Sequence, residues 1–393
     1  MTYRSSILAS LALAVLAAGC GSTVIGGNSG GAGGDTGTST ISGTTSTISG
    51  TTGTTTTGTT TGTTTGTTTT TTTGVGGAPA DSGWPPPGPV HAPDGAGPAV
   101  FAIRKLFLGD TNRDGTPNMV NGWKQYGYNL DGRVSTANST DLCKPRSNAS
   151  PHQVYPDGND GIDNSFGKNI LPILLGIQSD LATSANDAIA SGKGTILFDL
   201  EKLGAGADYN PLIGRAYEGA SLAQPPLWNG NDAWPVASSS LASPPDLTSA
   251  KVQTAQGYVV GNTWVAPLQG DLTIKLDSSS LGIPIIIHDP VITMELDPAH
   301  QTAKNGTIAG VIPTDAFMQA MKQVAGTFDP TLCSGATLQS ILAQIAQASD
   351  ILLDGTQDPT KQCDGISVGL GFDATMVKFG TVVTTPPPPN PCP

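Results

Sequence analysis

Three short segments of the chain alternate apolar and polar residues with a period of two: residues 195–200, 271–277 and 291–297. Because successive side chains of a β-strand point to opposite faces, this alternation predicts strands with one buried and one solvated face. Half-buried strands of this kind are typical of antiparallel sheets. Four more strands are predicted at residues 256–265, 283–288, 307–312 and 366–379.

Three other segments carry apolar residues at helical spacing. The first covers residues 170–190, and the second covers residues 315–325 with Thr314 as its N-cap. In the third, Gly355 is expected to end the helix. Its apolar positions are Leu338, Ile341, Leu342, Ile345, Ala348 and Leu352. Strands and helices do not alternate strictly, so the pattern predicts an α+β fold. We expect an antiparallel β-rich, sandwich-like domain over residues 98–383, with about three helices.

The N-terminus has a different pattern. Arg4 precedes an apolar run over residues 7–18, which is too short to span the ~30 Å of a bilayer core. The run ends in Leu16-Ala17-Ala18-Gly19-Cys20, which resembles the lipobox of bacterial lipoproteins, although Ala17 stands where Leu or Val is more common. This resemblance implies removal of residues 1–19 as a signal peptide and attachment of lipid, such as palmitate, to Cys20. The alternative is an ordinary secretory signal whose Cys20 pairs elsewhere.

Residues 20–97 are predicted to form a stalk. Residues 21–74 are almost entirely Gly, Thr and Ser and offer nothing to bury, so they are predicted to be disordered. A proline-rich spacer over residues 79–98 is expected to be extended. Residues 384–393 form a second proline-rich tail.

Composition narrows the classes of partner. The chain has 393 residues and a formal net charge of −12, and it has no run of clustered Lys and Arg. Nucleic acid is therefore not expected as a partner, since phosphate binding needs such clusters. The acidic balance suits solubility at a cell surface and an affinity for cations.

Four cysteines remain once Cys20 carries lipid. They are Cys143, Cys333, Cys363 and Cys392, and an even number in an exported chain predicts disulfides. Four cysteines allow three pairings. The favoured pairing is Cys333–Cys363 with Cys143–Cys392. Zinc is the alternative, but the sequence has no C-x-x-C motif to support it.

An acidic loop region over residues 108–165 carries the best chemical signal. Residues 110–118 place oxygen-bearing side chains at alternate positions and a glycine at the sixth position. This spacing resembles the calcium loops of thrombospondin type 3 repeats and EF-hands, although Asn121 replaces the bidentate Glu of an EF-hand. The resemblance implies a structural Ca²⁺ held by Asp110, Asn112, Asp114, Thr116 and Asn118.

Two further segments of the acidic loop region are weaker candidates for calcium. Residues 157–164 also resemble the type 3 repeat, with Asp157, Asp160 and Asp163 as the implied ligands. Residues 129–132 form a shorter match. The alternative for all three loops is a solvated turn, because Asp, Asn and Gly favour turns in any case.

The sequence brings no catalytic constellation together. The G-x-S-x-G match at residues 27–31 lies in the stalk, without the strand and helix that a nucleophile elbow needs. The carboxylate pairs Asp199/Glu201 and Glu295/Asp297 have glycosidase-like spacing, but we expect them on solvated strand faces. Trp228 and Trp234 are candidates for a sugar-binding surface. The alternative is that these tryptophans pack against the core.

Together these features predict a lipoprotein anchored by lipid in the cell envelope, at the outer membrane or cell surface. Its calcium-stabilised domain is expected to serve binding or scaffolding, with a carbohydrate or a surface protein as partner. The alternative is a secreted hydrolase that acts on glycan or peptide.

Overall fold

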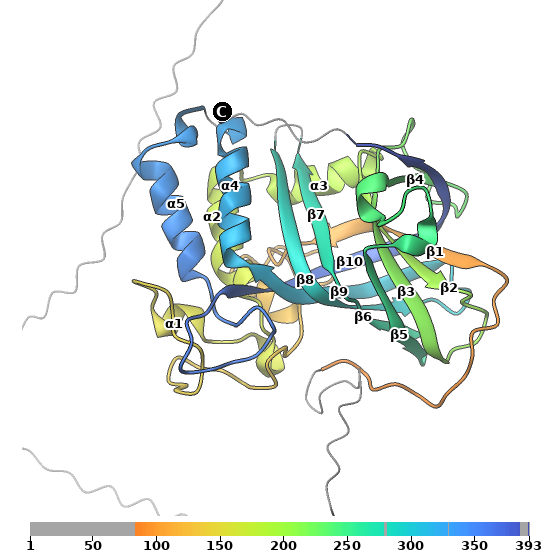
Figure 1. Ribbon diagram of the computed structural model, residues 1–393, viewed down its shortest axis with the longest axis horizontal. Coiled ribbons are helices and arrows are strands. Elements are labelled where there is room, and N and C mark those ends of the chain that lie inside the picture. The colour runs from red at the N-terminus through yellow and green to blue at the C-terminus, as the bar shows by residue number, and fades with distance from the viewer. Residues whose placement is uncertain (1–82, 279–280, 329, 386–391, 393) are drawn as a thin grey trace, which may run out of the picture. The chain divides into compact units, whose positions relative to one another are not determined.

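A single sheet closes on itself to form the centre of the molecule (Figure 1). The structure is a computed structural model that describes residues 83–278, 281–328, 330–385 and 392. The chain divides into two units, residues 1–70 and 71–393, and the described residues belong to the second. The predicted leader, the lipidated Cys20 and the Gly/Thr-rich stalk lie outside the described residues.

Ten strands are present in the described part of the chain. They are β1 (Pro98–Phe107), β2 (Thr195–Glu201), β3 (Tyr209–Gly219), β4 (Ala233–Ala237), β5 (Val252–Val260), β6 (Thr263–Pro267), β7 (Asp271–Ser278), β8 (Leu281–Leu296), β9 (Thr302–Pro313) and β10 (Gly365–Val383). Eight of them form a closed barrel in the order β1-β2-β3-β5-β6-β8-β9-β10, and β10 pairs with β1 to close it. All of these neighbours are antiparallel.

The inside of the barrel is filled by large side chains. Phe198 is fully buried, and its ring lies 5.7 Å from that of Trp264 and 5.3 Å from that of Phe372, measured between centroids. Phe101 is paired with Phe198 in the register of β1 and β2 and is also fully buried. An eight-stranded barrel is just wide enough to be filled in this way.

Two strands lie off the barrel path. Strand β4 pairs in parallel with β10 and covers part of the outer face of the barrel, where Trp234 and Val236 pack against Val100, Leu197 and Tyr217. Among the described residues, β7 pairs with β8 alone, and the two strands extend beyond the barrel as a hairpin. Helices line one side of this hairpin (Figure 1).

The described part of the chain contains five α-helices. They are α1 (Pro151–Val154), α2 (Leu171–Ile177), α3 (Leu181–Ala190), α4 (Thr314–Phe328) and α5 (Ala336–Gln347). Helix α3 packs against β1 and β7, α4 packs against β8, and α5 packs against α4. The barrel core and the helical layer form one continuous apolar cluster. None of the described helices is long and apolar enough to cross a membrane.

The antiparallel, β-rich prediction is confirmed, but several details were wrong. The sheet closes into a barrel rather than forming a sandwich, and β1, β3 and β4 were not predicted. The strand predicted at residues 256–265 is the β5–β6 hairpin, because Gly261 and Asn262 both have positive φ and turn the chain.

The helical predictions also need correction at their ends. The helix predicted at residues 170–190 breaks into α2 and α3, with extended backbone at Gln178. The third predicted helix ends at Gln347, and Ala348 and Leu352 are buried in the loop that follows. Their apolar character therefore reflects packing of a loop rather than a longer helix.

Residues 83–97, which we call the strap, pack on the barrel instead of forming a free spacer. Tyr258 Oη donates a hydrogen bond to the carbonyl of Pro85 at 2.6 Å. Asn210 Nδ2 donates to the carbonyl of Gly88 at 2.6 Å, and Tyr209 Oη donates to Asp94 Oδ1 at 2.7 Å. The structured part of the chain therefore begins before residue 98.

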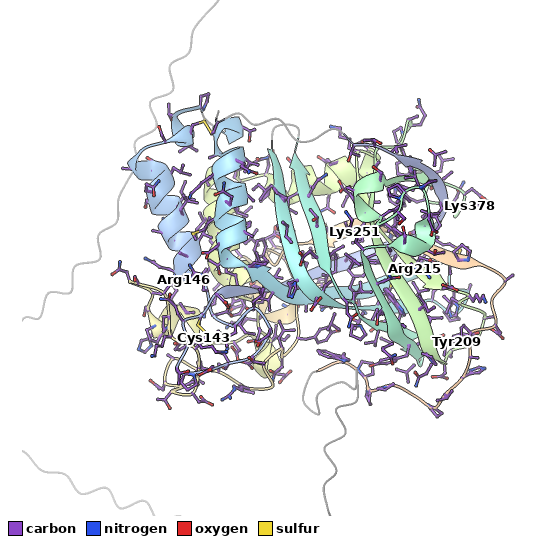
Figure 2. All side chains as sticks on the ribbon, viewed as in Figure 1. Cys143, Arg146, Tyr209, Arg215, Lys251 and Lys378 are labelled. Carbon is purple, nitrogen blue, oxygen red and sulfur yellow. A yellow bond between two sulfur atoms is a disulfide. The ribbon has the colours of Figure 1, made fainter. Side chains whose placement is uncertain are left out.

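The four cysteines pair as Cys143–Cys363 and Cys333–Cys392. The prediction of two disulfides is confirmed, but the favoured pairing was wrong. The physical reason is local: the backbones of Lys144 and Cys363 are joined by a 2.9 Å hydrogen bond, so the segments around Cys143 and Cys363 lie side by side. Cys143 lies in the loop-rich part of the molecule, away from Tyr209 (Figure 2).

Candidate functional site

The loop at residues 110–118 is held by its own hydrogen bonds. Asn112 Oδ1 accepts from Asn118 Nδ2 at 2.7 Å and from Gln125 Nε2 at 2.6 Å. Asp114 Oδ1 accepts from the backbone N–H of Thr116 at 2.8 Å and from its hydroxyl at 2.6 Å. A calcium ion on these oxygens would have to replace those bonds. Calcium at this loop therefore stays a prediction.

Asp110, the first residue of that loop, is half-buried, and burial raises the pKa of its carboxyl. The neighbouring Arg113 joins the loop to β9. Its guanidinium donates to the carbonyl of Gly306 at 3.3 Å and to Thr307 Oγ1 at 2.8 Å. These bonds join the loop to the wall of the barrel.

The two weaker candidate loops lie against each other. The backbone N–H of Leu130 donates to Asp163 Oδ2 at 2.7 Å, and the N–H of Asp163 donates to the carbonyl of Tyr128 at 2.9 Å. Farther along, the N–H of Asp157 donates to the carbonyl of Ser135 at 3.3 Å, and the N–H of Ser135 donates to Asp157 Oδ2. These bonds bring together Asp131, Asp157 and Asp163, which we call the acidic cluster.

Two buried oxygens at the acidic cluster have no hydrogen-bond partner among the described residues: Asp131 Oδ2 and Ser135 Oγ. Ser135 is 7% exposed and Asp163 is 3% exposed. Buried polar atoms are nearly always paired, so these two oxygens indicate a missing donor or cation. Asp160, which the sequence included in the set, is exposed with φ of 54° and shows no contact with the cluster.

The carboxyl groups of Asp157 and Asp163 resist ionisation. Burial raises the pKa of Asp157 to about 8, and the charges of Asp131 and Asp350 act in the same direction. Burial also raises the pKa of Asp163 well above its usual range. Lys168 is nearby, but burial lowers the pKa of its ammonium to about 8, and its Nζ donates to the carbonyl of Pro156 at 2.8 Å. The charge of Lys168 therefore offsets the rise in the pKa of Asp157 only in part.

As the side chains stand, no three His, Cys, Asp or Glu groups in the described chain converge closely enough to hold one metal ion. Asp131, Asp157 and Asp163 interact electrostatically but do not share a common ligand point. Binding of Ca²⁺ would need these side chains to move inward, and Ca²⁺ tolerates such flexible geometry.

Asn164, next to Asp163, fixes the acidic cluster to the barrel. Its Nδ2 donates to the carbonyls of Trp123 at 3.0 Å, Tyr126 at 3.1 Å and Gly369 at 3.0 Å. Its Oδ1 accepts from the N–H of Gly167 at 2.9 Å and from that of Gly369 at 3.0 Å. From the sequence, Asn164 was expected only to favour a turn. No local pattern reveals a partner on β10, some 200 residues away.

The tryptophan pair does not form an open sugar-binding surface. Trp234 is fully buried, and its indole N–H donates to the carbonyl of Ala220 at 2.7 Å. Trp228 is half-buried, with its ring centroid 5.5 Å from that of Trp234. Burial of Trp234 in β4 agrees with the alternative expectation that this tryptophan packs into the core.

The solvated position predicted for Asp199 was also wrong. Asp199 is 4% exposed, because β4 and the loop after it cover this face of β2. Arg215 donates to Asp199 Oδ2 at 3.0 Å and to Glu201 Oε2 at 2.6 Å. The arrangement is a buried ion-pair network, and burial raises the pKa of Asp199 to about 6.

This raised pKa predicts a pH-dependent stability. Asp199 faces Arg215, Glu201 and Tyr217, and it holds its proton more tightly when folded than when unfolded. The stability that Asp199 adds to the folded state is therefore fully present below about pH 4 and is lost as the pH rises through about 6. We expect the unfolding free energy of the wild type minus that of Asp199→Asn to fall by up to ~1.4 kcal/mol per pH unit in this range.

Urea unfolding at several pH values, in constant Ca²⁺, measures this difference. Contributions from other carboxyl groups cancel between the two proteins. Asp315→Asn, at an exposed carboxylate, serves as the control and should show a nearly constant difference. A difference for Asp199→Asn that does not change between pH 4 and pH 7 would contradict the assignment.

The fold and the candidate site define an eight-stranded antiparallel barrel with a paired-loop acidic cluster at its side. Comparison with models of known families, with curated proteins and with solved structures finds no match for this chain. The proposals below therefore rest on the residues of this chain.

Proposed function

We propose that this chain is a lipid-anchored protein of the bacterial cell surface whose barrel domain is stabilised by Ca²⁺ at the acidic cluster. The domain serves binding or scaffolding. The observation that carries the proposal is the pair of unpartnered buried oxygens, Asp131 Oδ2 and Ser135 Oγ, beside two further carboxylates with raised pKa values.

The donor set suits a hard cation. Carboxylates of Asp131, Asp157 and Asp163 and the hydroxyl of Ser135 are oxygen ligands, which Ca²⁺ prefers. A bound cation would favour the ionised carboxylates and offset their mutual repulsion. It would also hold together two loops that are otherwise joined by only a few hydrogen bonds, such as the one from the N–H of Leu130 to Asp163 Oδ2.

The position of the acidic cluster supports a stabilising role. On one side, Asn164 joins it to Gly369 in β10. On another side, Asp350 accepts hydrogen bonds from the N–H of Ser367 at 2.8 Å and from its hydroxyl at 2.5 Å. An ion here would therefore strengthen the contact between the acidic loops and the barrel wall.

Thermal unfolding of residues 71–393 tests the proposal. This unit has its own core and both disulfides, so we expect it to fold without the preceding residues. EDTA should lower the melting temperature, and Ca²⁺ at about 100 times its Kd should restore close to 3 kcal/mol of stability. Asp131→Asn should abolish the response to Ca²⁺, because it alters the unpartnered carboxylate.

Asp114→Asn in the loop at residues 110–118 is the matched control and should keep the full response. If the response of the melting temperature to Ca²⁺ is lost in Asp114→Asn and kept in Asp131→Asn, the ion binds at the loop of residues 110–118 and not at the acidic cluster. An unchanged melting temperature in EDTA, with no calcium in the purified protein, would overturn the proposal.

A further inference from the structure

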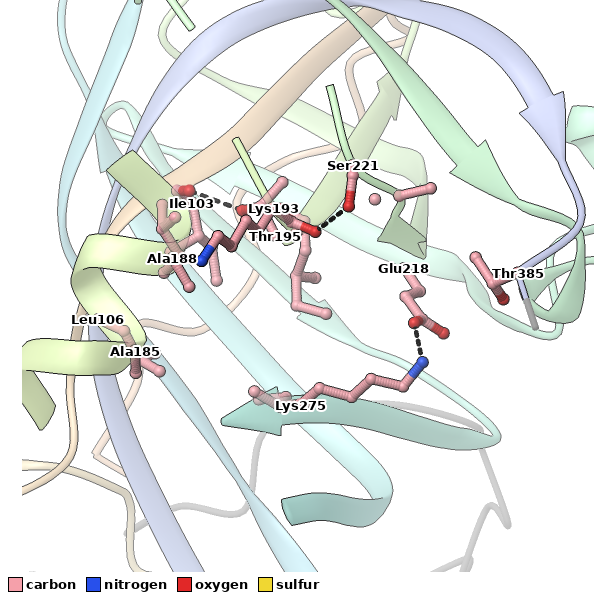
Figure 3. A pocket seen from close by; sticks show the side chains of 16 residues that line it. Ile103, Leu106, Ala185, Ala188, Lys193, Thr195, Glu218, Ser221, Lys275 and Thr385 are labelled. Carbon is pink, nitrogen blue, oxygen red and sulfur yellow. Dashed lines mark hydrogen bonds and ion pairs between the residues drawn. The ribbon is translucent and has the colours of Figure 1, made fainter. Parts of the chain in front are cut away.

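A pocket of about 200 Å³ opens at the end of the barrel where β1 ends, β2 begins and β3 ends (Figure 3). Helix α3 and strand β7 form its other walls. The strap contacts the opposite end of the barrel, near Lys202 and Tyr209. The pocket is separate from the acidic cluster, since the two share none of their residues.

The apolar wall of the pocket is aliphatic. Its main contributors in the described chain are Ile103, Leu106, Ala185, Ala188, Ile196 and Ile274. Where α3 passes over the pocket, the small side chains of Ala185 and Ala188 leave the space open. A surface of this kind suits a flexible hydrocarbon chain, since burial of each CH₂ group is favourable and needs no directed contact.

Two of the three hydroxyl groups at the pocket are already engaged. Thr195 Oγ1 donates to the carbonyl of Ile103 at 2.6 Å, and Ser221 Oγ donates to the carbonyl of Lys193 at 2.5 Å (Figure 3). The groups that remain to recognise a polar part of a ligand are the hydroxyl of Thr385 and three charged groups, Lys193, Lys275 and Glu218.

These three charges leave one positive charge in excess. Lys275 Nζ forms an ion pair with Glu218 Oε1 across the mouth (Figure 3). Lys193 forms no ion pair within the part of the chain that the structure describes, and its side chain is exposed at the mouth. An excess cation beside an apolar pocket is notable in a chain with a net charge of −12. It selects for a ligand with a single anionic group.

We propose that this pocket binds a medium-chain aliphatic carboxylate. The hydrocarbon chain lies between α3 and β7, among the aliphatic side chains, and the carboxylate meets Lys193 at the mouth. This binding activity goes beyond the calcium-stabilised scaffold, because it uses none of the residues of the acidic cluster.

Isothermal titration of residues 71–393 with decanoate tests the proposal. We expect a Kd on the order of 10 µM, which is typical of a small ligand held mainly by an apolar pocket. Decanol has the same chain without the charge and should bind about tenfold more weakly. Lys193→Gln should weaken decanoate by a similar factor and leave decanol unchanged. Lys378→Gln, at a lysine that bonds Asn231 away from the pocket, is the matched control and should bind like the wild type.

Filling the pocket is an independent check. Ala188→Leu should abolish binding of both ligands, and an unchanged melting temperature would show that the domain still folds. Ala185→Val provides a smaller obstruction in case the first variant does not fold. The proposal is overturned if decanoate gives no heat of binding, if decanoate and decanol bind equally, or if the folded filled variants bind like the wild type. Since calcium is measured by melting in EDTA, either proposal can fail without the other.

Discussion

Replacing both Cys143 and Cys363 with alanine is expected to lower the free energy of unfolding by ~5 kcal/mol. The two cysteines are 220 residues apart, so their disulfide removes a large amount of conformational entropy from the unfolded chain. Both side chains are fully buried, so the double variant also loses packing. Urea unfolding of residues 71–393 under non-reducing conditions measures the loss.

The second disulfide provides the comparison. Cys333 and Cys392 are 59 residues apart, so the same chain-entropy argument gives a loss that is ~1 kcal/mol smaller for their double alanine variant. If the Cys333/Cys392 variant were the less stable of the two, closure of the long loop would not be the main contribution of Cys143–Cys363.

Asn164→Ala is expected to cost about 4 kcal/mol of stability. The side chain is 2% exposed and serves three carbonyls and two backbone N–H groups, and each buried group left unpaired costs ~1–3 kcal/mol before relaxation. The midpoint of urea unfolding measures the effect. Asn164→Asp keeps an acceptor oxygen and loses the N–H donors. At neutral pH its stability should therefore lie between those of the wild type and Asn164→Ala, or fall below that of Asn164→Ala.

Asn138→Ala is the matched control for Asn164→Ala. Asn138 lies exposed in the same acidic loop region, and its replacement should change stability by less than about 0.5 kcal/mol. A loss below 1 kcal/mol for Asn164→Ala would show that the five hydrogen bonds are readily replaced by water.

Strands whose residues alternate between apolar and polar were predictable from the sequence, and the others were not. Strand β2 alternates cleanly in Thr195–Glu201, whereas β1 is buried on both faces for half of its length and shows no alternation. Strand β3 contains proline, glycine and the buried Arg215, all of which weaken a strand signal. Closure of the barrel depends on pairing of β1 with β10, and no local pattern encodes a contact over that separation.

In the candidate site, too, features set by neighbouring residues were predictable and contacts between distant segments were not. The sequence identified Asp157 and Asp163 by their spacing, and it identified the loop at residues 129–132 separately. It did not show that these loops pair, because no local spacing reveals that the carboxylates of Asp163 and Asp157 accept hydrogen bonds from the distant backbone N–H groups of Leu130 and Ser135. The solvated position predicted for Asp199 failed for a related reason: alternation reveals a polar face but not the strand that covers it.

The strap and the pocket occupy opposite ends of the barrel, and this has a mechanical consequence. A tether that joins the domain before residue 83 pulls on the strap first, which Tyr258 and Tyr209 hold through one hydrogen bond each and Asn210 holds through three. Under tension these bonds would yield one at a time, before any load reached β1 and the seam of the barrel. The strap would therefore yield before the barrel opens, and the pocket, at the opposite end of the barrel, would keep its shape.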